Sequence, residues 1–134
     1  MAILEKLQYT DSLLYAQLLN NLGSISLTAD DNAQAKDALE RSIALFGRLR
    51  GEDSSLLTNP LINLGIVFGK AEDYNLAEAA FMRALRIRQR VFGPDHPELV
   101  PLLNNLANVY MSRHENARAL EGLVDKTRPV RAAI

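Results

Sequence analysis

Asparagine side chains recur at one fixed spacing inside apolar stretches of this 134-residue chain. Asn21, Asn63 and Asn105 lie 42 residues apart, within the segments LLNNLGSIS, LINLGIVFG and LLNNLANVY. The amide of Asn offers two hydrogen-bond donors and an acceptor, so one side chain can pair with both groups of a peptide unit. These residues therefore favour hydrogen bonding to a polypeptide backbone as the chemistry of the chain.

Residue patterns typical of catalysis or metal binding do not occur in the sequence. The chain contains no Cys, and His96 and His114 lack a partner His four residues away and an acidic cluster at metal-ligand spacing. The sequence also lacks a phosphate-binding loop, a nucleophile elbow and a pair of catalytic carboxylates. We therefore expect a protein that is not an enzyme and that uses no metal and no cofactor.

The overall composition is that of one folded domain. Hydrophobic residues make up 48% of the chain and charged residues 23%. Fifteen Lys and Arg against 16 Asp and Glu give a net charge of −1, which disfavours a nucleic-acid partner. No apolar run is long enough to span a membrane, and the first residues lack a signal-peptide pattern. A cytoplasmic location without membrane association is the default expectation.

The 42-residue spacing extends well beyond the asparagines. Five further sets of positions keep it, and they are Leu19, Leu61 and Leu103; Leu22, Leu64 and Leu106; Gly23, Gly65 and Ala107; Ala35, Ala77 and Ala119; and Leu39, Phe81 and Leu123. A fixed period of this length is typical of stacked repeat units. The small residues at 23, 65 and 107 predict close approach of a second helix, with Ala35, Ala77 and Ala119 on that helix.

Each repeat contains two helical patterns joined by a short polar turn. In the middle repeat, Leu61, Leu64, Gly65 and Phe68 form one apolar stripe at helical spacing. The predicted helices span 2–8, 13–29, 32–49, 56–70, 73–92, 97–112 and 115–127, and no segment shows strand periodicity. Pro101 lies far enough past Pro97, the first residue of the predicted helix 97–112, that we expect it to remove a backbone hydrogen bond and to bend that helix.

The pattern Leu61-x2-Leu64-Gly65-x2-Phe68, followed by Ala77-x3-Phe81-x2-Ala84, resembles the tetratricopeptide repeat. The longer period and the segment ALRIRQRVFGPDHPEL resemble the kinesin-light-chain type of that repeat. The resemblance implies an all-α fold in which helix-turn-helix units stack into a right-handed α-solenoid. It also implies a concave groove that binds peptides or protein segments, and no catalysis.

We interpret residues 1–134 as a single domain of this kind. Its predicted parts are the end of a preceding repeat at 1–12, repeat 1 at 13–54, repeat 2 at 55–96, a partial repeat 3 at 97–127 and a tail at 128–134. Both ends of such a stack expose an apolar face unless they are capped. Self-association of the chain is therefore one prediction.

Helical spacing places one set of side chains toward the groove. The candidate peptide-binding residues are Gln17, Asn20, Asn21, Ser24, Leu27, Asn59, Ile62, Asn63, Ile66, Lys70, Asn104, Asn105, Asn108 and Met111. The Asn residues would hold the backbone of a ligand, and Leu27, Ile62, Ile66 and Met111 would supply apolar pockets. Lys70 is the only clear cation of the set. For Asn21, Asn63 and Asn105, a repeated structural hydrogen bond explains the spacing equally well.

The function predicted from these residues is that of a protein-interaction module with a scaffold or adaptor role. Its partner is a protein or peptide whose identity the sequence does not give. One alternative is a self-assembling scaffold, a homo-oligomer formed through the exposed ends or the groove. Another is a regulatory fragment of a larger signalling protein.

Overall fold

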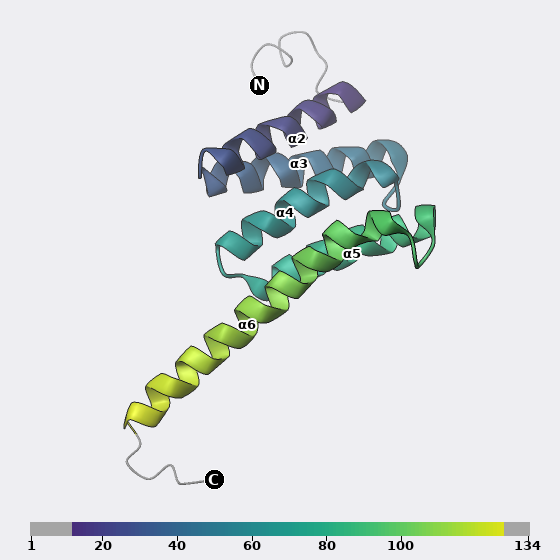
Figure 1. The fold of residues 1–134 in the computed structure, drawn as a ribbon. Coiled ribbons are helices and arrows are strands. Elements are labelled where there is room, and N and C mark those ends of the chain that lie inside the picture. The colour runs from purple at the N-terminus through teal and green to yellow at the C-terminus, as the bar shows by residue number, and fades with distance from the viewer. Residues whose placement is uncertain (1–11, 128–134) are drawn as a thin grey trace.

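Antiparallel helices stack along one direction in the computed structural model (Figure 1), which describes residues 12–127. The helices are α2 (Leu13–Thr28), α3 (Asn32–Arg50), α4 (Thr58–Lys70), α5 (Tyr74–Phe92) and α6 (Val100–Thr127), with single 3-10 turns η1 (Ser55–Leu57) before α4 and η2 (Pro97–Leu99) before α6. Residues 12–127 contain no strand. The predicted all-α repeat architecture is confirmed, while the helix predicted at 2–8 and the tail at 128–134 lie outside the described residues.

The turns inside the first two repeats are the same. Asp30 and Glu72 adopt positive φ angles of 57° and 61°, and an Asp at the N-cap position follows each of them. The N–H of Asp31 donates to the carbonyl of Ser26 over 2.8 Å, and that of Asp73 donates to Phe68 over 2.9 Å. These bonds use the last free carbonyls of α2 and α4 and reverse the chain within a few residues.

Close helix contact occurs at the small residues that the repeat spacing singled out. A Cβ atom placed on Gly23 would lie 2.5 Å from Leu39, and one on Gly65 would lie 2.5 Å from Phe81. Because such distances are shorter than van der Waals contact, only glycine lets these helices approach so closely. The paired residues Ala35 and Ala77 are fully buried, as predicted for repeats 1 and 2.

Pro101 does not bend a helix, so that prediction was wrong. The 3-10 turn η2 takes up Pro97 to Leu99, and His96 caps it by accepting a hydrogen bond from the N–H of Glu98 at Nδ1 over 3.0 Å. The α-helix α6 begins only at Val100. Pro101 therefore lies in the first helical turn, where a backbone N–H has no intrahelical partner to lose.

The third unit lacks the turn that was predicted after residue 112. α6 runs for 28 residues without a break, and Figure 1 shows its C-terminal half extending away from the stack. The positions of Asp30 and Asp31 are taken here by His114 and Glu115. Glu is not among the favoured N-cap residues, whereas Asp is. The helix continues where the first two repeats reverse direction. A side-chain cap bond does not by itself account for the difference, because Asp31 makes one in repeat 1 whereas Asp73 makes none in repeat 2.

This continuation leaves one face of α6 uncovered. Leu102, Leu106 and Val109 are buried against the preceding repeat. Leu103 and Tyr110 are 48% and 46% exposed, whereas their counterparts in repeat 2, Leu61 and Phe68, lie in the core and pack against it, respectively. The close approach of a second helix that was predicted at Ala107 is therefore not found among the described residues, and Ala107 is exposed.

Candidate functional site

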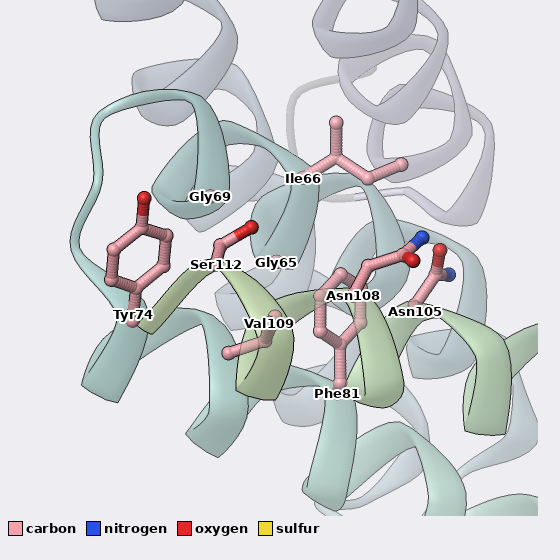
Figure 2. A pocket seen from close by; sticks show the side chains of 9 residues that line it. All are labelled: Gly65, Ile66, Gly69, Tyr74, Phe81, Asn105, Asn108, Val109 and Ser112. Carbon is pink, nitrogen blue, oxygen red and sulfur yellow. The ribbon is translucent and has the colours of Figure 1, made fainter. Parts of the chain in front are cut away.

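A cleft of about 180 Å³ lies between α4 and α6 (Figure 2). Three helices line it, with Gly65, Ile66 and Gly69 from α4, Tyr74 and Phe81 from α5, and Asn105, Asn108, Val109 and Ser112 from α6. Stacking of α6 on the α4–α5 pair brings these residues together across more than 40 positions of sequence. The cleft is smaller than the roughly 300–1,000 Å³ typical of small-molecule sites. Its size suits a single amino-acid side chain.

The floor of the cleft is apolar. Phe81 and Val109 are buried there, with exposed fractions of 3% and 5%. Gly65 and Gly69 contribute no side chain, and a Cβ atom placed on Gly69 would meet no other atom within 4 Å. The space next to Gly69 is therefore open because no side chain fills it. An apolar group placed there would leave water and contact Phe81 and Val109.

The rim of the cleft is polar and uncharged. Asn105, Asn108 and Ser112 lie along α6 at the side of the opening, and Figure 2 shows both amide groups on the same side as Ile66. Asn105 is half-buried and Asn108 is exposed. Among residues 12–127, neither amide forms a hydrogen bond with another side chain or with the backbone outside its own helix. Both amides are thus free to bond a ligand.

Two other asparagines of the predicted set bond each other instead. The amide of Asn63 donates to Oδ1 of Asn20 over 3.1 Å and so joins α4 to α2. Asn20 is only 6% exposed, and its role is structural. The corresponding bond of Asn105 would need an Asn at position 62, where the chain has Ile62. The structural bond therefore forms once, and Asn105 is left without a partner for it.

Lys70 and Leu27 both contact other residues of the first two repeats. The ammonium of Lys70 donates to the carbonyl of Leu27 over 3.2 Å and pairs with Asp30 over 3.1 Å. A cation at this place stabilises the C-terminal end of α2. The side chain of Leu27 is buried against α3 and α4. The predicted groove cation Lys70 is thus paired within the chain, and the side chain of Leu27, which was predicted to supply an apolar pocket, lies in the core.

The remaining candidates are divided between separate places. Ser24, Asn104 and Met111 are exposed, Ile62 is half-buried, and none of these four lines the cleft. Gln17 and Asn21 bond each other on the surface of α2 over 3.1 Å. Asn59 lines a different depression, together with Ser55, Thr58, Arg88, Val91 and Phe92. Of the predicted set, the structure brings Ile66, Asn105 and Asn108 into one cleft.

Tyr74 is one of the cleft residues that sequence reasoning did not assign to the groove. It lies in the polar turn AEDYN, at a position where the other repeats have Asn32 and Asn116. Tyr74 is the one aromatic residue among these three equivalent positions, and this difference is the signal in the sequence that could have identified it as a site residue. Its hydroxyl accepts a hydrogen bond from the amide of Asn116 over 3.4 Å.

A polar cluster next to the cleft fixes α6 on α5. The hydroxyl of Tyr110 donates to the carboxylate of Glu78, which lowers the pKa of Glu78 from 4.5, and the adjacent Arg113 acts in the same direction. The same hydrogen bond raises the pKa of Tyr110 from 10.0. Arg113 lies 3.4 Å from Glu78 and also donates to the carbonyl of Tyr74 over 3.3 Å. This cluster holds the α6 side of the cleft in place.

Comparison with known proteins gives a family and a fold. The family model described as Tetratricopeptide repeat matches residues 14–89 and, overlapping them, 56–121. No curated protein matches the chain. The crystal structure of BtubC (BKLC) from P. vanneervenii is similar, with a TM-score of 0.77 and 22% identity over 99% of this chain.

The match covers 57% of the BtubC chain, so the present chain spans little more than half of that protein's length. At this identity the similarity shows a shared fold.

A separate finding concerns membranes: no helix within residues 12–127 is both long enough and apolar enough to cross one. Among the side chains that the structure describes, no three His, Asp or Glu gather closely enough to hold a metal ion.

Proposed function

Because this chain belongs to the tetratricopeptide repeat family, whose members generally serve as protein-interaction scaffolds, we propose that it binds a segment of a partner protein in the cleft between α4 and α6. One apolar side chain of the partner enters the cleft. The amides of Asn105 and Asn108 bond the partner's backbone next to that side chain.

The observation that carries this proposal is the pair of free amides beside an open apolar cavity. An Asn side chain that is structural normally has a partner in the folded chain, as Asn20 and Asn63 do. Asn105 and Asn108 lack one while lying at the opening of a cavity with a buried Phe81 at its floor. Backbone hydrogen bonds combined with one side-chain pocket are a common arrangement for peptide recognition.

The charge of the residues that line the cleft also restricts which side chain of the partner can bind there. The nine residues that line the cleft include no Asp, Glu, Lys, Arg or His. Lys70, the nearest expected cation, is paired with Asp30. Recognition of a carboxylate or phosphate usually needs converging Arg or Lys side chains. The partner residue that enters the cleft is therefore an uncharged aliphatic one.

The proposal is tested by selecting peptides from a random 12-residue display library on the purified chain. Gly69→Leu serves as the blocked variant, because Gly69 lines the cleft and a Cβ atom placed on it meets no other atom within 4 Å. Ser24→Leu is the matched control, since Ser24 is an exposed α2 position outside the cleft. We expect enriched peptides to share an aliphatic residue and to bind the wild type and Ser24→Leu alike, but not Gly69→Leu. Enrichment that is equal on all three proteins contradicts the proposal.

A further inference from the structure

The cleft between α4 and α6 corresponds to a place that a leucine side chain occupies in the preceding repeat. Three residues of the cleft have counterparts 42 positions earlier, and the pairs are Leu27 and Gly69, Leu39 and Phe81, and Val67 and Val109. Leu27 is 8% exposed and belongs to one apolar cluster with Leu39 and Val67. Its side chain therefore occupies the space among α2, α3 and α4 whose counterpart among α4, α5 and α6 is the cleft.

Gly69 is the residue that leaves this space open. Close packing does not require a glycine there, because a Cβ atom placed on Gly69 meets no other atom within 4 Å, whereas one on Gly65 would lie 2.5 Å from Phe81. The backbone of Gly69 is helical, without a positive φ angle, and glycine is less favourable than Ala within a helix. Packing and backbone geometry within residues 12–127 thus give no reason for the missing side chain.

Larger side chains elsewhere in repeat 2 do not close the space. Phe81 lies where repeat 1 has Leu39, and Tyr74 lies where it has Asn32. A volume of about 180 Å³ nevertheless remains open between α4 and α6 (Figure 2). The cleft therefore has room for one more side chain, which none of the described residues supplies.

Resting on the function proposed above, we propose that the partner residue that enters the cleft is leucine, and that its side chain takes the place that Leu27 has in repeat 1. The leucine then packs on Phe81 and Val109, the counterparts of two residues that cluster with Leu27. Gly69 is the specificity-determining residue, because its missing side chain makes the cleft. An alanine of the partner would leave much of the cleft unfilled, and a phenylalanine would overfill it.

Substitutions at position 69 measure the fit of leucine without a partner. In Gly69→Leu, α4 itself supplies the side chain, as α2 does with Leu27. We expect this variant to melt at least about 3 °C above Gly69→Ala, because three more carbon atoms leave water. The matched control compares Ser24→Leu with Ser24→Ala on the exposed face of α2, and these two should melt within about 1 °C of each other. A Gly69→Leu variant that melts no higher than Gly69→Ala would overturn the proposal.

The second arm uses peptides selected on the full chain from the 12-residue display library. Leu should be the residue shared by the peptides that Gly69→Leu fails to bind, and its replacement by Ala or Phe should weaken binding at least about tenfold. Enrichment of a different residue, or equal binding of the Leu and Phe peptides, would overturn the assignment of leucine while groove binding stands. Equal enrichment on the wild type and Gly69→Leu would instead contradict the proposed function itself, and the melting comparison distinguishes that failure from a poor fit of leucine.

Discussion

At the scale of single residues, the same amide group has two roles in this chain. Asn20 and Asn63 are bonded to each other and connect neighbouring repeats. Asn105 and Asn108 have no such bond and lie at the cleft. The difference comes from one position. Asn63 bonds Asn20, which lies 43 residues before it, whereas the residue 43 positions before Asn105 is Ile62, which cannot accept this hydrogen bond.

Replacing Asn63 by Ala tests the structural role. The change leaves Oδ1 of the buried Asn20 without its donor, and an unpaired buried polar group costs about 1–3 kcal/mol. We expect urea denaturation to show a loss of unfolding free energy in this range. The exposed Asn104→Ala is the control and should change it by less than about 0.5 kcal/mol. Equal stability of both variants would show that the Asn20–Asn63 bond contributes nothing.

Tyr110→Phe tests the cluster that fixes α6. It removes the hydrogen bond that lowers the pKa of Glu78, so that pKa should rise toward 4.5 in a titration followed by NMR. In the wild type, the lowered pKa of Glu78 gives stability that is present above pH 4.5 and is lost as the pH falls through the folded-state pKa. The raised pKa of Tyr110 gives stability that is present below pH 10.0 and is lost as the pH rises through its folded-state pKa. An unchanged Glu78 titration in Tyr110→Phe would rule out this hydrogen bond.

At the scale of helices, the repeat period predicted which segments pair but not whether each turn forms. The four helices of repeats 1 and 2 and the close contacts at Gly23 and Gly65 follow directly from the spacing. The turn also needs a residue that adopts positive φ and a good N-cap after it, and these are local requirements. His114 and Glu115 do not reproduce Asp30 and Asp31, so periodicity alone misplaced a turn in α6.

The two glycines of α4 should respond to Ala in opposite ways. Gly65→Ala places a methyl group 2.5 Å from Phe81, and overpacking of this kind costs about 1–3 kcal/mol. Gly69→Ala meets no atom and gains roughly 0.5–1 kcal/mol from the better helix propensity of Ala. Thermal melting should therefore show a lower Tm for Gly65→Ala and a higher Tm for Gly69→Ala. Shifts of the same sign would contradict the packing described for α4.

At the scale of the whole molecule, the cleft depends on three helices at once, and this limited its prediction from sequence. Helical spacing identified Ile66, Asn105 and Asn108, because these residues share the groove side of α4 and α6. It did not identify Tyr74, and it assigned Phe81 to packing alone. Both residues belong to α5, and their place in the cleft depends on how α5 packs against α4 and α6. Helical spacing did not predict that Lys70 bonds the turn of the preceding repeat, at the carbonyl of Leu27 and at Asp30.

The most direct test of groove binding is a calorimetric titration of a selected peptide into the wild type, Gly69→Leu, Asn108→Ala and Ser24→Leu. Burial of one aliphatic side chain predicts a negative heat-capacity change for the wild type. We expect at least about tenfold weaker binding for Gly69→Leu, and weaker binding by about 0.5–1.5 kcal/mol for Asn108→Ala. Ser24→Leu should bind like the wild type. Equal affinity of Gly69→Leu and the wild type would show that the peptide binds elsewhere, and the cleft would not be the functional site.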